Sequence, residues 1–367
     1  MQISAFIIYN FFDFNSNKHT IGGVQTYLKD LIDVLVGLNI KPILCQIGTD
    51  ERDASLANYE VRQYNVKDIS ALIGRVKDCA NTAKDLLIYG TDTLIVPNDG
   101  FRYSIGIQHG ISWDIPVNTN HSILRYIAAT ARQTYKTIKR INNVKCLVCV
   151  DYNFQNWYRT QVDHDRTFLT VIPNYTHIGP VLQKNAETIN IIFARRFFPY
   201  RGTRVFTQAI KRILREYRSV NVTIAGSGPD EEWMKKELKG IDHVEFTKYS
   251  SEDSLKIHAD KHIAVVPTVG SEGTSLSLLE AMSAQCAVVA SDVGGITNIL
   301  IDGYNGLIVK AGDSDRLYMA IKRLIDNPQE RERLAMEGYS TVFHGFSHEK
   351  WANSWKNVIN HILLSGE

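Results

Sequence analysis

Short apolar runs rich in Val and Ile alternate along the chain with longer stretches in which apolar residues recur every three or four positions. The short runs predict buried strands, and the longer stretches predict helices with one apolar face. Strands that alternate with helices favour parallel sheets, which is an α/β fold class. The predicted strands are residues 3–8, 42–47, 86–89, 93–96, 103–108, 146–150, 190–194, 221–225, 244–246, 263–266, 287–290 and 306–308. The clearest predicted helices are residues 24–37, 205–216, 230–238, 276–284 and 348–364.

The strand pattern stops and restarts shortly before residue 190. Pro173, Gly179 and Pro180 interrupt regular structure there. A chain of 367 residues is also too long for one ordinary core. We therefore expect two α/β domains, residues 1–178 and 179–347. Each would be a Rossmann-like sheet that binds ligands at the carboxyl ends of its strands.

Composition excludes some function classes. Hydrophobic residues make up 44% of the chain and charged residues 22%, as in soluble globular proteins. The net charge of +2 gives no global reason to expect a nucleic acid partner. Five cysteines in so long a chain do not suggest a disulfide framework. Cys146 and Cys149 form a C-x-x-C pair inside a predicted strand, so we expect buried thiols rather than a metal or redox site.

The N-terminal residues have no basic region and no small-residue cleavage site, so we interpret them as the first strand rather than a signal peptide. No apolar run reaches the roughly 18 residues of a membrane-spanning helix. We therefore expect a cytoplasmic protein.

The sharpest chemical pattern lies about three quarters of the way along the chain. A glycine-rich turn follows a predicted strand, and a helix is expected to open there. Backbone N–H groups at this helix start, over Thr274, Ser275 and Leu276, suit a phosphate. Glu272 is placed to accept hydrogen bonds from sugar hydroxyls, and Glu280 to hold ribose hydroxyls. The competing interpretation is a helix-start carboxylate stabilised by the helix dipole and an ordinary helix glutamate.

The run from Glu272 to Met282, Glu-Gly-Thr-Ser-Leu-Ser-Leu-Leu-Glu-Ala-Met, resembles the E-x7-E signature of retaining glycosyltransferases of family 4. Further matches run from Gly22 to about Gly306. The resemblance implies the GT-B architecture, with two facing Rossmann-like domains, parallel sheets and an interdomain cleft. Residues 179–347 would then be the nucleotide-sugar donor domain. The C-terminal helix, residues 348–367, would return to the N-terminal, acceptor-side domain.

A basic loop upstream fits the same family. The run Phe193-Ala-Arg-Arg-Phe-Phe-Pro-Tyr-Arg-Gly-Thr203 follows a strand and precedes a helix. Two cations at a strand end can neutralise a diphosphate while its bond breaks. In the family's loop, Gly-Arg-Leu followed by Lys-Gly, Arg195 falls on the arginine and Arg201 on the lysine. The change from Lys to Arg keeps the charge and alters the geometry. A solvated basic loop is the alternative.

Weaker candidates lie at other strand ends and helix starts. Gly22 and Gly23 open the first long helix and resemble the family's N-terminal glycine loop, where a backbone approaches a phosphate or sugar closely. Gly226 resembles the family's glycine turn near the nucleotide. His109 follows a strand and resembles the histidine that approaches the donor sugar, and Asp114 is a candidate for acceptor binding. Ordinary turns and a structural histidine are the plain alternatives.

Residues 121–145 carry six basic side chains and no acidic one. Apolar residues recur at helical spacing on one face, and most of the basic residues fall on another. Such a helix would suit an anionic membrane surface, at the inner face of the plasma membrane, or an acceptor that carries a lipid phosphate. Equally, its apolar face would pack on a sheet while its basic face meets water. Both interpretations stay open.

The resemblance implies a hexosyltransferase-type enzyme. It would move a sugar from a nucleotide diphosphate sugar to a glycan or lipid-linked glycan with retention of configuration, in a context such as bacterial surface polysaccharide biosynthesis. The leaving phosphate would take the acceptor's proton, and no metal or other cofactor is expected. Asp313-Ser-Asp315 has the letters of a metal-binding Asp-x-Asp, but we interpret it as a helix N-cap. A nucleotide-sugar epimerase and a non-catalytic sugar or nucleotide binding module are the alternatives.

Overall fold

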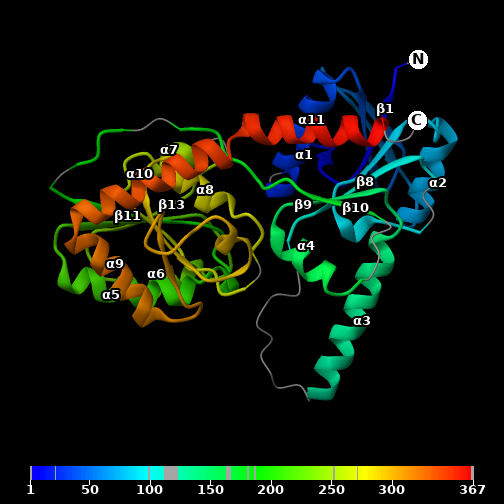
Figure 1. The fold of residues 1–367 in the computed structure, drawn as a ribbon. Helices are drawn as coiled ribbons and strands as arrows, with labels where there is room; N and C mark the ends of the chain where they lie inside the picture. The colour runs from blue at the N-terminus through cyan, green and yellow to red at the C-terminus, as the bar shows by residue number, and fades with distance from the viewer. Residues whose placement is uncertain are drawn as a thin grey trace. The chain divides into compact units, whose positions relative to one another are not determined.

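The computed structural model describes residues 2–20, 22–97, 100–110, 123–162, 167–179, 182–185, 187–250, 253–270 and 272–364. The chain divides into two compact units (Figure 1). The first unit comprises Met1–His109, Asn118–Pro173 and Trp351–Glu367, and the second comprises Gly110–Val117 and Asn174–Lys350. The units therefore part after Pro173 and again within the last helix, whereas the sequence predicts these boundaries at residues 178 and 347.

An eight-stranded sheet forms the core of the first unit, with the order β10-β9-β8-β7-β1-β4-β6-β5. All neighbouring strands pair in parallel except β5 and β6, which are antiparallel. Every residue of β7, β8 and β9 is buried, which explains the unbroken apolar sequences of β7 and β9. The strands are β1 (Ser4–Ile8), β4 (Lys41–Ile47), β5 (Arg52–Ser55), β6 (Glu60–Tyr64), β7 (Leu86–Tyr89), β8 (Tyr103–Gln108), β9 (Cys146–Cys149) and β10 (Phe168–Val171), with a separate pair β2 (Phe12–Asp13) and β3 (Lys18–His19).

The helices of the first unit are α1 (Gly23–Gly37), α2 (Ile69–Cys79), α3 (Ile123–Ile141) and α4 (Tyr152–Arg159), together with most of α11 (His348–Leu364). Two tryptophans anchor α11 to α1. The indole of Trp355 donates a hydrogen bond of 2.9 Å to the hydroxyl of Tyr27, and the ring of Trp351 meets the Tyr27 ring edge to face. These buried aromatic contacts place the C-terminal helix in the first unit.

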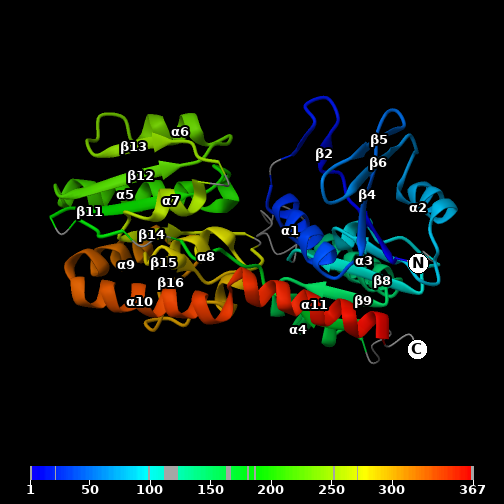
Figure 2. The same ribbon diagram turned by 90° about the horizontal axis from the view of Figure 1, so that it is seen from above.

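A six-stranded parallel sheet forms the core of the second unit, with the order β13-β12-β11-β14-β15-β16 (Figure 2). Alternate residues of β11 face opposite sides of this sheet. Ile191 and Phe193 pack in a core with α5, α6 and α9, while Ile192 and Ala194 pack in a core with α8. The elements are β11 (Ile189–Ala194), α5 (Thr203–Glu216), β12 (Val220–Ala225), α6 (Glu231–Glu237), β13 (Val244–Thr247), α7 (Ser254–His258), β14 (Ile263–Val266), α8 (Leu276–Ser283), β15 (Ala287–Ser291), β16 (Leu307–Val309), α9 (Ser314–Asp326) and α10 (Pro328–Gly345).

The predicted strand at residues 93–96 is wrong. The chain forms a short 3-10 helix, η1 (Asp92–Leu94), and then an extended turn. Ile95 is buried over β8, since a Cβ added at Gly106 would lie 2.6 Å from its Cδ1 atom. The β-branched residues of this run thus bury themselves by packing on the face of the sheet, and β8 takes the place beside β7. Sequence reasoning also missed the short strands β5, β6 and β10, of which β5 and β6 carry several polar residues.

The C-x-x-C pair lies in β9, where Cys146 and Cys149 are both free and buried. Burial raises the pKa of the Cys146 thiol to about 12, so this thiol is not reactive at neutral pH. The prediction of buried thiols is confirmed.

Candidate functional site

The strands of the second unit bring two distant loops to one edge of its sheet. β11 ends at Ala194, immediately before Arg195, and β14 ends at Val266, shortly before Glu272. Because β11 and β14 are parallel neighbours, both loops leave the sheet at the same edge. Ligands of such sheets bind at this edge. Arg195 and Glu272, 77 residues apart in the sequence, meet there.

Three donors converge on one oxygen of the Glu272 carboxylate, Oε2. The Arg195 guanidinium donates at 2.7 Å and the Thr268 hydroxyl at 3.0 Å, and Arg201 donates a third hydrogen bond. The pair is almost completely enclosed, with side-chain exposures of 8% for Glu272 and 4% for Arg195. No described residue donates a hydrogen bond to Oε1 of Glu272. The two predicted arginines and the predicted glutamate therefore form one buried ion cluster, with one carboxylate oxygen left to bind a hydroxyl.

Burial by itself would raise the pKa of Glu272, but the charges of Arg195 and Arg201 outweigh burial. Together, these effects lower the pKa of Glu272 from 4.5 to about 2. Glu272 is therefore an anion at every physiological pH, and it accepts hydrogen bonds only. A group in this state orients hydroxyls and balances positive charge, and it cannot serve as an acid.

Thr268 and Tyr200 belong to the cluster, and sequence reasoning missed them. The Thr268 hydroxyl is also a hydrogen-bond partner of Arg195. The Arg201 guanidinium carbon lies 5.1 Å from the centre of the Tyr200 ring, and the Tyr200 carbonyl accepts a 2.9 Å hydrogen bond from Val269. The signal was present, because both residues lie in the two loops that follow β11 and β14.

Two glycines let the loops after β12 and β15 pack against the two loops of the site. Gly226 has a φ of 143°, and a Cβ there would lie 2.0 Å from the carbonyl oxygen of Arg195. Gly294 has a φ of 49°, and a Cβ there would lie 2.1 Å from the carbonyl oxygen of Glu272. Gly295 then donates a backbone hydrogen bond of 2.8 Å to that same oxygen. Gly226 was predicted to contact a ligand, and in this structure it packs against the backbone that carries Arg195.

We expect Gly294→Ala to destabilise the protein by roughly 1–3 kcal/mol and to displace the peptide of Glu272. The matched control is Gly312→Ala, because Gly312 also has a positive φ, 81°, but has no atom within 4 Å of an added Cβ. Thermal unfolding of both variants measures the difference. Equal stability losses would show that close packing on Glu272 has no energetic importance.

The α8 helix opens directly after the ion cluster, at Leu276 as predicted. Ser275 is its N-cap residue, and the Ser275 side chain makes no capping hydrogen bond. Thr274 and Ser275 are buried, and the Thr274 carbonyl accepts a 2.7 Å hydrogen bond from Asn174. An uncapped helix start carries backbone N–H groups and a partial positive charge, which favour an anion such as a phosphate.

Glu280 lies within α8, and burial raises its pKa to about 7 although Ser254 hydrogen-bonds to it. The carboxyl group is thus near half protonation at neutral pH, and it can both donate and accept hydrogen bonds. Burial also raises the pKa of Tyr249, and the charge of Glu280 raises it further while that of Arg195 lowers it. Tyr249 therefore lies within electrostatic range of both Glu280 and Arg195.

A pocket of about 440 Å³ lies next to this edge of the sheet. Its lining comes from the ends of β12 and β13, the loop after β11, and α6. The lining residues are Phe197, Gly226, Glu231, Lys235, Phe246, Thr247 and Lys248. The predicted Gly226 is one of them. Phe197, which belongs to the same loop as Arg195, is another, so the pocket lies beside that loop.

The predicted residues of the first unit lie apart from that cluster in sequence. His109 follows β8, and its Nε2 atom lies 2.9 Å from the Gly90 carbonyl. Burial lowers the pKa of His109 to about 4, so the ring is neutral. Because a carbonyl only accepts, Nε2 carries the proton and Nδ1 is the acceptor. Gly22 is the N-cap of α1 and Gly23 its first residue, as predicted. Asp114 lies outside the described residues.

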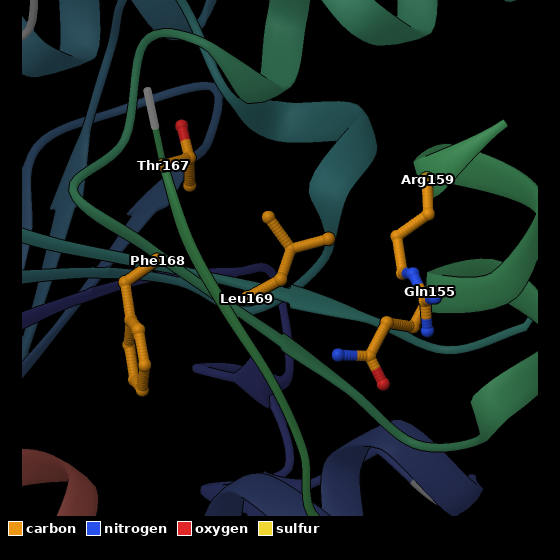
Figure 3. Close-up of a pocket in the computed structure, with 5 residues that line it drawn as sticks. All are labelled: Gln155, Arg159, Thr167, Phe168 and Leu169. Atoms are coloured by element: carbon orange, nitrogen blue, oxygen red, sulfur yellow. The ribbon is translucent and has the colours of Figure 1, made fainter. Parts of the chain in front are cut away.

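Another pocket, of about 390 Å³, lies between α4 and the edge strand β10 of the first unit (Figure 3). None of its lining residues is a predicted site residue. They are Gln155, Arg159, Thr167, Phe168 and Leu169. The Thr167 hydroxyl is engaged by the backbone, at 3.1 Å from the Ile141 carbonyl and 3.0 Å from the Val144 carbonyl.

Asp313 is the N-cap of α9, and its carboxylate accepts a 2.9 Å hydrogen bond from the Arg316 backbone. Asp315 pairs with Arg212. The N-cap prediction is confirmed, and both carboxylates have structural partners.

Comparison with known proteins finds both a family model and similar solved structures. Residues 176–341 match the family model of glycosyl transferases group 1. A phosphatidyl-myo-inositol mannosyltransferase of Mycobacterium leprae is 33% identical over 156 residues, which cover 41% of this chain and 41% of that protein. The match therefore spans less than half the length of this curated relative.

Solved structures share the fold over nearly the whole chain. The sucrose-phosphate synthase of Thermosynechococcus elongatus has a TM-score of 0.78 at 16% identity, covering 99% of this chain and 100% of that one. Anabaena HepE, solved in complex with UDP, has a TM-score of 0.72 at 15% identity, covering 98% and 99%. The predicted α/β fold class is confirmed. The chain has the fold of GT-B glycosyltransferases, and its residues 176–341 resemble the glycosyl transferases group 1 family.

Proposed function

We propose that this protein is a retaining, metal-independent glycosyltransferase. It transfers a sugar from a nucleotide diphosphate sugar to a glycan or lipid-linked glycan acceptor, in the biosynthesis of bacterial surface polysaccharide. The observation that carries the proposal is the buried Glu272 carboxylate, held by Arg195 and Arg201 beside the uncapped start of α8. This arrangement offers hydrogen-bond acceptors for a sugar and positive charge for a diphosphate.

The roles of the residues follow from their charges. Arg195 and Arg201 stabilise the negative charge that develops on the leaving diphosphate, and the N–H groups at Ser275 and Leu276 add to it. Glu272 orients the sugar through its Oε1 atom. Glu280 binds ribose hydroxyls. Because the leaving phosphate itself takes the acceptor's proton, the site needs no strong base.

The remaining assignments complete the proposal. His109 would hydrogen-bond the donor sugar through Nδ1, and Gly22 and Gly23 would let the α1 backbone approach donor or acceptor. Two observations support a nucleotide-sugar donor. Residues 176–341 match the glycosyl transferases group 1 model, and the similar structure of Anabaena HepE is a complex with UDP. We place the enzyme in the cytoplasm, at the inner face of the plasma membrane.

The test is a titration with UDP, GDP, dTDP and ADP in the presence of EDTA, followed by thermal unfolding. A nucleotide that binds only the folded protein stabilises it by about 2.7 kcal/mol at a hundredfold excess over its Kd. We expect one of the four to raise the melting temperature without metal. A shift that appears only after Mg²⁺ or Mn²⁺ is added would refute metal independence.

The matching nucleotide sugar then distinguishes transfer from the alternatives. Nucleoside diphosphate release that depends on a glycan or lipid-linked acceptor supports the proposal. An isomerised sugar formed from the donor alone would instead identify an epimerase. Binding without any release would identify a binding module.

A further inference from the structure

The α3 helix (Ile123–Ile141) carries large apolar side chains in solvent. Leu124 is 75% exposed, Ile127 57% and Tyr135 65%. They lie on one face of the helix together with Ala128 and Ala131, which are exposed as well. Of the two interpretations left open for this helix, the one in which its apolar face packs on a sheet is therefore wrong for these residues. A contiguous exposed apolar face on an otherwise polar helix marks an interaction surface.

Basic residues flank one side of that face over the C-terminal half of the helix. Arg132, Lys136 and Lys139 are all exposed and follow one another at helical spacing, on the side next to Leu124 and Tyr135. The helix contains no acidic residue. The surface that binds α3 is therefore expected to carry negative charge at its outside and an apolar layer beneath.

The opposite side of α3 is attached to its own unit near the C-terminal end. Thr137 and Ile141 are buried, and Arg140 forms an ion pair of 3.4 Å with Asp92 of η1. Figure 1 shows the N-terminal end of α3 lying away from the sheet of the first unit. The helix has 19 residues. At a rise of 1.5 Å per residue, the side presented to solvent extends for roughly 28 Å.

We propose that α3 docks the protein on an anionic lipid bilayer. Leu124, Ile127 and Tyr135 enter the boundary between headgroups and acyl chains, while Arg132, Lys136 and Lys139 contact lipid phosphates. An in-plane helix with an apolar face and a cationic flank has this mode of binding. No helix among the described parts of the chain has the length and hydropathy required to span a bilayer. The docking is therefore peripheral, and it does not depend on the proposed sugar transfer.

The experiment is flotation of the purified full chain with vesicles of phosphatidylcholine alone, or with equal parts of phosphatidylglycerol. We expect binding to the anionic vesicles at low salt and its loss at high salt. The variant Arg132→Gln/Lys136→Gln/Lys139→Gln should bind on the order of a hundredfold more weakly, from three lost lipid contacts. Leu124→Ser/Ile127→Ser should bind roughly tenfold or more weakly.

The matched control is Arg215→Gln/Arg218→Gln/Lys310→Gln. It removes the same charge from exposed positions of the second unit and should bind as the wild type does. All variants alter exposed side chains, so their melting temperatures should equal that of the wild type. Nucleotide titration of the same samples reports on the donor site separately.

Three results would overturn the proposal. The first is that the wild type does not float with anionic vesicles at low salt. The exposed face of α3 would then be assigned to binding another protein. The second is equal binding to phosphatidylcholine alone. The third is an α3 charge variant that binds as tightly as the control variant. Failure of the nucleotide titration would affect only the proposed transfer.

Discussion

Glu272→Gln is expected to slow sugar transfer by roughly a hundredfold or more, because a neutral amide binds the sugar hydroxyls more weakly than a carboxylate. The amide also no longer balances the two arginines. The measurement is the initial rate of nucleoside diphosphate release from the donor identified by titration.

The same variant should bind nucleoside diphosphate more tightly. In the wild type, Arg195 and Arg201 already have a counter-ion, since both pair with Oε2 of Glu272. Glu272→Gln removes that competitor, so the phosphates meet two uncompensated guanidiniums. The melting shift produced by nucleotide should therefore exceed that of the wild type, although the free variant is less stable.

The control is Glu332→Gln, which removes a carboxylate from the exposed side of α10. It should change neither rate nor binding. A Glu272→Gln enzyme with normal transfer would remove Glu272 from the site. Slow transfer with a smaller nucleotide shift would indicate general damage to the fold.

Acid unfolding offers an independent check on Glu272. Its folded pKa of about 2 lies below its ordinary value of 4.5. The ionised carboxylate therefore stabilises the folded state above about pH 4.5, and this contribution is lost as the pH falls through 2. The full contribution is ~3 kcal/mol at 1.36 kcal/mol per unit. The difference in unfolding free energy between wild type and Glu272→Gln should shrink over that range of pH.

Arg195→Met is the second variant with a large expected effect. Its guanidinium is enclosed and bonds both Glu272 and Thr268. Methionine fills the space but leaves a buried carboxylate with fewer partners, at a cost of about 3 kcal/mol. That loss lowers the melting temperature by roughly 10 °C. Nucleotide should then produce little or no melting shift, and transfer should fall by about a hundredfold or more.

Arg196→Met is the matched control, because Arg196 is the next residue but is exposed, and its guanidinium lies over the ring of Phe198. It should leave stability within about 0.5 kcal/mol of the wild type and leave nucleotide binding intact. An Arg195→Met protein with the wild-type melting temperature and an intact nucleotide shift would contradict the site. Equal effects of the two variants would assign the loss to charge alone.

The strand and helix elements that carry the site could be predicted from the sequence. Continuous Val and Ile runs predict strands buried on both faces, and β11, β14 and α8 appear close to their predicted positions. Parallel strands release their loops at one edge, so Arg195 and Glu272 could be expected to share it. The prediction of a strand at residues 93–96 was wrong because β-branched residues favour any buried extended position, whether or not that position pairs in a sheet.

Sequence alone thus determined the alternation of strands and helices and the charged residues at the strand ends, since both depend on local periodicity and order along the chain. Only the tertiary structure decided that Glu272 presents one oxygen to two arginines and Thr268, and that Gly294 packs on its peptide. These contacts join segments far apart in the chain and depend on packing at atomic distances. The same holds for α3, because an amphipathic pattern is identical whether its apolar face is covered or exposed. Its three-dimensional surroundings leave Leu124, Ile127 and Tyr135 in solvent.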